Sequence, residues 1–291
     1  MPQQQFTNDG MVQAVSSDPM DLREMRGMPA QRHPWEVARA RFFRTLLTDE
    51  GVLDGASRVL DVGAGDGYVA RELAAAMAHG GEVVCFDPHY SEQHLRRLER
   101  ETGGGTPRVR FTRDSPEGVF DLMLLLDVIE HVDDDRALLA GLVRDRLRQG
   151  GAVLVSVPAW QALYTRHDLF LGHYRRYRPA DLHRLLTQVD LQRVRGGGLF
   201  HGLLLPRAVE KLFELLRGVR PSPGVEGLGG DQRNGATGVE EEMGVGGWSH
   251  GPTLTAAVTA ALAADNALSG LAFRAGVGLP GLSTWALCRK G

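Results

Sequence analysis

A regular alternation of short apolar runs with segments of helical periodicity, over residues 57–158, is the feature that most constrains the fold. The apolar runs predict strands, which we expect over residues 57–62, 82–87, 108–114, 120–127 and 152–158. Helices are expected between them, over residues 68–81, 91–100 and 133–147. Strands that alternate with helices form a mostly parallel sheet with helices on both faces. The sequence therefore predicts the α/β class.

The flanking segments suggest a division into four parts. We expect a flexible N-terminal arm at 1–30, a core at 31–200, a helical cap at 201–280 and a final strand at 281–291. The core begins with a helix over 35–47 and ends, after a long connection 159–178, with a helix from Pro179 and a strand over 191–194. The cap contains helices over 203–216 and 253–273, whose apolar faces either bury each other or line a pocket. Between them lies an insert, 218–252, which is predicted to be flexible because it holds eleven glycines and three prolines.

Composition bounds the function. A net charge of −3 over 291 residues gives no electrostatic footprint for nucleic acid or an anionic membrane. Cys85 and Cys288 lie in apolar runs and are predicted to be buried thiols. The N-terminus does not resemble a secretory signal, and no run approaches the roughly 20 apolar residues that span a bilayer. We expect a cytoplasmic protein without stable membrane insertion, and the oligomeric state stays open.

Three glycines after the first strand, in "DVGAGDG", indicate a ligand loop. A dinucleotide-binding loop needs a third glycine where Tyr68 stands, and a P-loop needs a Gly-Lys-Ser/Thr end that is absent. The pattern Asp-x-Gly-x-Gly-x-Gly of S-adenosylmethionine enzymes matches in full, from Asp61 to Gly67. We therefore predict S-adenosylmethionine as the cofactor and S-adenosylhomocysteine as the product.

The cofactor prediction assigns roles to individual residues. Asp61 attracts the ammonium group, Asp87 accepts from the ribose hydroxyls, and Asp114 meets the adenine amino group. His33 and Trp35 either fold over the cofactor or pack on the first helix. The full set of predicted cofactor-binding residues is Asp61, Gly63, Ala64, Gly65, Gly67, Asp87, Pro88, Asp114, Ser115, Asp127, Val128, His33 and Trp35.

With these residues in place, the chain resembles a class I S-adenosylmethionine-dependent methyltransferase over about residues 30–200. "VLDVGAGDGYVA" is similar to the first motif of that family, and "DVIEHV" resembles a subgroup with quinone-biosynthesis and small-molecule enzymes. "RHPWEVARARFF" and "RHDLFLGHYRRYRPADL" resemble a bacterial subset often encoded beside glycosyltransferases. The resemblance implies a Rossmann-like sheet of seven strands whose last strand is antiparallel. The segment 200–280 departs from the family.

Candidate catalytic residues follow the fourth and fifth strands, where ligands of open parallel sheets bind. They are His131, His173, His167 and Tyr177, with His173 favoured for proton transfer and Glu130 beside His131 as a further candidate. Each has a structural alternative: His131 can bond backbone in a tight turn, and the loop aromatics can pack on the sheet. The arginines at 166, 175, 176 and 178 either grip an anionic substrate or form a solvated helix start. The spacing of His167, Asp168 and His173 fits no standard metal site, so no metal is expected.

The leading hypothesis is an enzyme that methylates an O, N or C atom of a small molecule, such as a natural product of secondary metabolism, a quinone-like compound or a lipid-linked sugar. A non-catalytic S-adenosylmethionine-binding regulatory protein is the alternative from another class. A nucleic-acid or protein methyltransferase is disfavoured because Asp127-Val128-Ile129-Glu130 replaces the Asn/Asp-Pro-Pro-aromatic motif.

Overall fold

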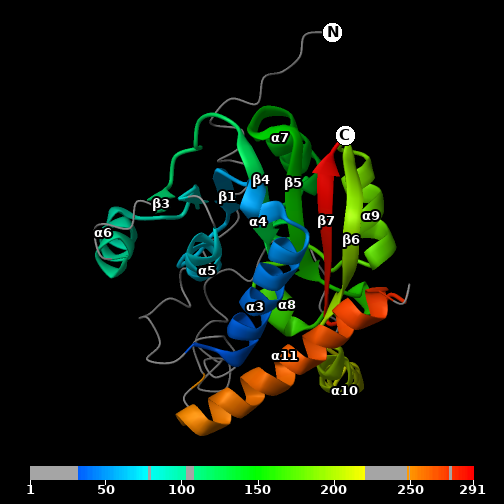
Figure 1. Ribbon diagram of the computed structural model, residues 1–291. Coiled ribbons are helices and arrows are strands. Elements are labelled where there is room, and N and C mark those ends of the chain that lie inside the picture. The colour runs from blue at the N-terminus through cyan, green and yellow to red at the C-terminus, as the bar shows by residue number, and fades with distance from the viewer. Residues whose placement is uncertain (1–31, 78–79, 103–107, 220–247, 249, 275–276) are drawn as a thin grey trace.

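A seven-stranded sheet is the centre of the computed structural model, which describes residues 32–77, 80–102, 108–219, 248, 250–274 and 277–291 (Figure 1). Its strand order is β3-β2-β1-β4-β5-β7-β6. The strands are β1 Arg58–Val62, β2 Glu82–Phe86, β3 Val109–Thr112, β4 Phe120–Leu126, β5 Leu147–Pro158, β6 Leu191–Leu199 and β7 Ser283–Lys290. Strands β1 to β5 each pair in parallel with their neighbours within this group, as predicted. The last strand, β7, is antiparallel to both β5 and β6, also as predicted.

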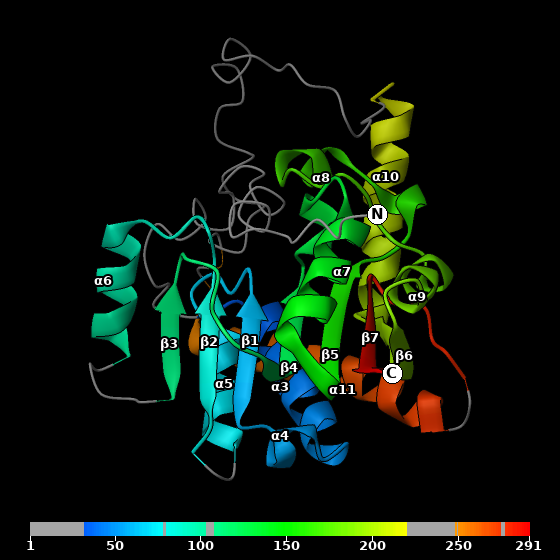
Figure 2. The same cartoon turned by 90° about the horizontal axis from the view of Figure 1, so that it is seen from above.

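Helices cover both faces of this sheet (Figure 2). The α-helices are α3 Pro34–Asp49, α4 Val52–Gly55, α5 Tyr68–Ala76, α6 Glu92–Glu101, α7 Asp135–Arg146, α8 Arg166–Phe170, α9 Pro179–Thr187, α10 Leu204–Leu216 and α11 Pro252–Arg274. Short 3₁₀ turns are η1 Ile129–His131, η2 Gln161–Leu163 and η3 His201–Leu203. Helix α11 runs beside α3 and also contacts β6 (Figure 1).

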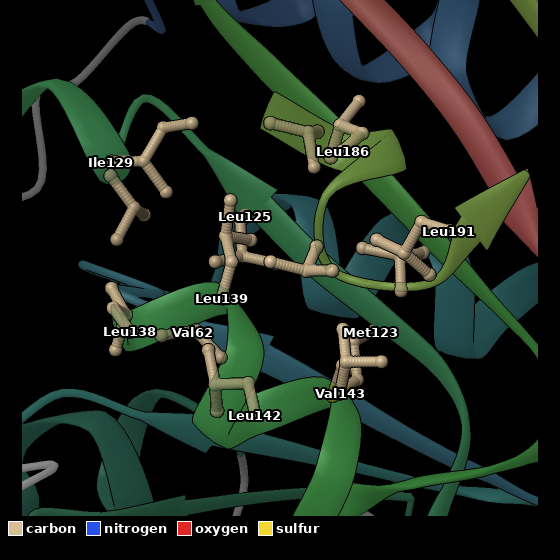
Figure 3. Close-up of a cluster of buried hydrophobic side chains, with 14 of the residues drawn as sticks. Val62, Met123, Leu125, Ile129, Leu138, Leu139, Leu142, Val143, Leu186 and Leu191 are labelled. Carbon is tan, nitrogen blue, oxygen red and sulfur yellow. The ribbon is translucent and has the colours of Figure 1, made fainter. Parts of the chain in front are cut away.

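The period of two along the strands sorts their side chains into two apolar cores. In β4, Met123 and Leu125 join the first core, under α7 and α9, whereas Leu122 and Leu124 join the second core, under α3 and α5. Figure 3 shows part of the first core, where Leu139 and other side chains of α7 lie close to the strand residues. Burial on both faces explains why this strand is an unbroken apolar run.

The structure corrects several predicted boundaries. Helix α5 ends at Ala76, before the predicted stop at Gly80, and β5 begins directly after α7. A helix, α8, lies inside the predicted connection 159–178. Strand β6 continues to Leu199 through three glycines. Propensity alone disfavours glycine in a strand. Close packing requires it at Gly198, where a Cβ would stand 2.4 Å from the backbone of Gly281.

The predicted division into four parts stays a prediction. Residues 1–30 lie outside the described residues, as do 220–247 and 249 of the predicted insert. The two cap helices, however, do not bury their apolar faces in each other: Leu205 and Leu216 of α10 are 72% and 74% exposed.

Both cysteines are free and buried, as predicted. A continuous run of roughly 20 apolar residues was not expected, and α11 is not one, because Thr255, Asp265 and Asn266 interrupt it. Within the described residues, Pro252–Ala272 is long and apolar enough by length and composition to cross a membrane. Scattered threonines interrupt its apolar run, which is why the run does not stand out in the sequence.

Candidate functional site

The glycine loop joins the carboxyl end of β1 to α5. Gly63, Gly65 and Gly67 have φ of +64°, +53° and +71°, a region that side chains with a Cβ disfavour. A Cβ on Gly63 would stand 2.8 Å from Val128, and one on Gly67 would stand 2.5 Å from the Phe111 ring. Within the described residues, no heavy atom beyond Gly65 and its two chain neighbours lies within 4 Å of a Cβ built on Gly65. The loop is thus held by packing at both ends, and its middle is accessible to a ligand.

Two buried carboxylates flank this loop. Asp61 and Asp87, at the ends of β1 and β2, are 4% and 5% exposed. Burial raises the pKa of Asp61 to about 7; Arg39 opposes the rise, and the charge of Asp87 adds to it. One oxygen of Asp87 accepts from the backbone N–H of His89 at 2.9 Å. A cationic or hydroxyl-bearing ligand would offset the desolvation of these groups.

Two arginines that sequence reasoning missed lie near the start of the chain's first described helix: Arg32 precedes α3 and Arg39 lies within it. Arg32 forms an ion pair with Asp66 of the glycine loop, and Arg39 forms one with Asp127. The Arg39 guanidinium also lies 4.0 Å from the centre of the Trp35 ring. The two arginines in "RHPWEVAR", one before the predicted helix 35–47 and one inside it, were the available signal, but nothing in the sequence shows which carboxylates they meet.

His33 and Trp35 make protein contacts. The His33 side chain caps α3 by accepting from the backbone N–H of Trp35 at 3.1 Å. The Trp35 ring stacks on Phe200, with centroids 5.3 Å apart. Their roles toward a cofactor stay predictions.

The remaining predicted cofactor residues occupy the same edge of the sheet. Asp127 has a φ of +57° and donates its backbone N–H to Ser156, which fixes the turn after β4. Asp114 is exposed, and the hydroxyl of buried Ser115 accepts from Arg146 at 3.4 Å. Tyr90, a residue that we did not predict, donates its hydroxyl to the carbonyl of Gly65. Ala64 and Pro88 lie in the turns after β1 and β2.

A second cluster lies after β4, in the turn that continues from Val128. The His131 and His173 rings meet edge to face, with centroids 4.7 Å apart. His173 Nδ1 lies 2.9 Å from Asp168 Oδ1. Since Val128 also packs on Gly63, the turn connects this cluster to the glycine loop.

Asp168 is the buried centre of this second cluster. It accepts hydrogen bonds at 2.7 Å from Arg176 of the loop and from Arg207 of α10. Burial alone would raise its pKa, but the bond to His173 and the charge of Arg176 outweigh burial and lower the pKa. Asp168 therefore stays ionised and orients the His173 ring.

The other catalytic candidates differ in environment. Burial, together with the nearby His173, lowers the pKa of His131 to about 3, so this imidazole is neutral at pH 7. The Tyr177 hydroxyl lies 2.6 Å from Asp135, and burial followed by this bond raises its pKa. Burial and the charge of Arg207 lower the pKa of half-buried His167.

The structure also bears on metals and anions. Ligand atoms of Glu130, His131 and His173 lie within 4.8 Å of one another, a set that could hold a metal ion. The sequence offers a different trio, His167, Asp168 and His173, and no metal is expected there. Of the four loop arginines, Arg176 bonds Asp168, Arg175 lies 3.0 Å from Asp135, and Arg178 pairs with Asp181. These ion pairs do not support the binding of an anionic substrate by Arg175, Arg176 and Arg178.

Comparison with known proteins identifies the family. A sequence model described as "Methyltransferase domain" matches residues 31–195, which is more than half of the chain. The chain belongs to this methyltransferase-domain family. An uncharacterized methyltransferase of Mycobacteroides abscessus is similar to it, with 30% identity over 157 residues, covering 48% of this chain and 59% of that protein. The chain thus spans less than two thirds of that relative.

Two further relatives extend this likeness. A ubiquinone biosynthesis O-methyltransferase of Pectobacterium atrosepticum is 26% identical over 168 residues, covering 52% of this chain and 68% of that enzyme. Among solved structures, a candidate sarcosine dimethylglycine methyltransferase from Galdieria sulphuraria has a TM-score of 0.50 and 17% identity, covering 87% of this chain and 85% of that one. The structural likeness supports the Rossmann-like methyltransferase fold alone.

Proposed function

We propose that this protein is an S-adenosylmethionine-dependent methyltransferase that acts on an oxygen, nitrogen or carbon atom of a small molecule. The observation that carries the proposal is the junction at Val128, where the open glycine loop meets the turn that leads to His131. A cofactor on the loop and an acid–base group in the second cluster would then be neighbours, as methyl transfer requires.

The glycine loop fits the cofactor. The backbone around Gly65 is open to approach, and Asp61 is a buried carboxylate whose raised pKa a nearby ammonium group would lower. Asp87 follows β2, where it can accept from ribose hydroxyls. When bound, S-adenosylmethionine supplies a methyl group on a sulfonium.

The second cluster would handle the substrate proton. We assign His173 as the general base, since Asp168 accepts from its Nδ1–H and so leaves Nε2 able to accept a proton. Neutral His131, which faces the His173 ring, would orient the substrate. Asp168 acts through His173 and is a positioning residue.

Titration of S-adenosylhomocysteine by calorimetry tests the cofactor site. Asp87→Ala removes the acceptors for the ribose hydroxyls, so we expect affinity to fall by roughly thirty-fold or more. Asp54→Ala, at an exposed carboxylate of α4, is the matched control and should bind like the wild type. If the wild-type protein does not bind, or if Asp87→Ala binds equally well, the cofactor assignment fails.

Turnover separates an enzyme from a binding protein. With labelled S-adenosylmethionine and a bacterial small-molecule extract, the wild type should label a product, and His173→Gln should lower the rate by about 10²–10⁴. Cofactor affinity measured by calorimetry should not change in His173→Gln. Normal cofactor binding without any labelled product from the wild type would instead favour a regulatory protein.

A further inference from the structure

Helix α10 turns its polar side toward the protein and its apolar side outward. Three polar side chains of α10 form hydrogen bonds with residues 164–168. Arg207 reaches Asp168, Lys211 donates to the carbonyl of Tyr164 at 2.5 Å, and Glu214 accepts from the backbone N–H of Arg166 at 2.9 Å. The opposite side exposes large apolar side chains, namely Leu205, Val209, Leu212, Phe213, Leu215 and Leu216. This orientation is the reverse of that of a helix on a water-soluble core.

Helix α11 repeats this inversion. Among its described residues, the most buried side chains are polar, namely Thr255, Thr259, Asn266 and Ser269, while Leu262 and Ala263 are partly buried against the second core. Asn266 accepts from the backbone N–H of Phe200 at 2.9 Å, and Ser269 donates to the carbonyl of Gly198 in β6. Its exposed large side chains are leucines, Leu254, Leu268 and Leu271. Only 22% of its most apolar stretch is buried, and residues 252–264 carry no charge.

We propose that α10 and α11 form a docking surface for a lipid bilayer, on which both helices lie without crossing it. Two helices with polar residues inside and apolar residues outside have the arrangement of protein that contacts hydrocarbon. Figure 1 shows both helices on the same lower side of the molecule. Helix α11 is held to α3 and β6 along its length, so it docks as part of the folded protein.

Charge at the edge of this surface favours anionic headgroups. Exposed Arg217 follows the last turn of α10, and exposed Arg166 is bonded through its backbone to Glu214 of the same helix. Cations beside an apolar helix face strengthen binding to anionic lipids. The net charge of −3 hides this local arrangement. The proposal goes beyond methyl transfer and stands without it.

Sedimentation with lipid vesicles tests this surface. The full chain should bind phosphatidylcholine vesicles and bind more tightly when phosphatidylglycerol is added. Leu212→Glu combined with Phe213→Glu should reduce binding by at least roughly tenfold, because it places two charges on the apolar face. Both residues are 55% exposed, so the fold should survive, which the far-UV circular dichroism spectrum and the thermal midpoint check.

Two more variants sharpen the test. Leu268→Glu with Leu271→Glu on α11 should also weaken vesicle binding, whereas Val119→Glu, at a 50% exposed residue before β4, should bind like the wild type. Absence of vesicle binding by the wild type overturns the proposal. Binding that needs phosphatidylglycerol and survives the α10 variant also overturns it. A wild-type dimer in sedimentation velocity that the α10 variant dissociates would instead assign the surface to a second copy of the chain.

Discussion

The glycine-loop region and the Asp168 region lie at the same edge of the sheet but are built differently. The first consists of backbone turns whose parts are close in sequence, with Asp61, Gly63 and Gly67 within seven residues. The second consists of side-chain charges from distant segments, since Arg207 of α10 reaches Asp168 across 39 positions. Backbone turns that pack on Val128 and Phe111 at their ends therefore sustain the first region, and long-range electrostatics sustains the second.

Breaking the second region should have the largest effect. Asp168→Asn leaves Arg176 and Arg207 buried without their carboxylate, which should cost about 3–5 kcal/mol in the free energy of unfolding. Urea unfolding measures it. Asp181→Asn, at an exposed carboxylate 3.2 Å from Arg184, is the control and should cost less than about 1 kcal/mol. Equal losses in both variants would mean that the buried charges are already solvated.

Adding a single methyl group to a glycine of the first region should lower the stability of the protein. Gly67→Ala strains a positive φ and pushes Phe111, so we expect a loss of about 2–4 kcal/mol, again by urea unfolding. Gly65→Ala has the same backbone strain but open space, so about 1–2 kcal/mol is expected. If the Gly65 variant were the less stable of the two, packing at the ends of the loop would not be what holds it.

The last difference is in pH dependence, where each group changes stability by on the order of 1 kcal/mol per pH unit. Asp61 holds its proton in the folded state up to about pH 7 against an ordinary pKa of 3.8, so its contribution to stability is lost as the pH rises between these values. His131 has a folded pKa of about 3 against 6.5, so its contribution is lost as the pH falls between them.

Matched variants separate these two opposite slopes. Asp61→Asn should gain stability relative to the wild type as the pH rises from 4 to 7, and His131→Gln should gain it as the pH falls from 6.5 to 3. Thermal unfolding across this pH range measures both. Parallel curves for wild type and variants would show that neither group titrates differently on folding.

Much of the first region could be predicted, because its information is local. The order of strands and helices follows from apolar periodicity. The glycine spacing from Asp61 to Gly67 indicates a loop that leads into helix α5. The arginine partners could not be predicted, since Arg32 and Arg39 meet Asp66 and Asp127 only after α3 packs beside the sheet. The pairing of His131 with His173 likewise depends on where the loop after β5 returns.

The sequence by itself determined the α/β class and the glycine loop, because hydrophobic period and backbone freedom act between near neighbours. The antiparallel last strand was expected only from the resemblance to the family. Only the tertiary structure decided which charges surround Asp168 and which sides of α10 and α11 face outward. The amphipathic pattern of α10 specifies an apolar face but not its partner. An ion pair and a hydrogen bond with the segment 164–168 turn the polar side of α10 inward, and those contacts exist only once distant parts of the chain have come together.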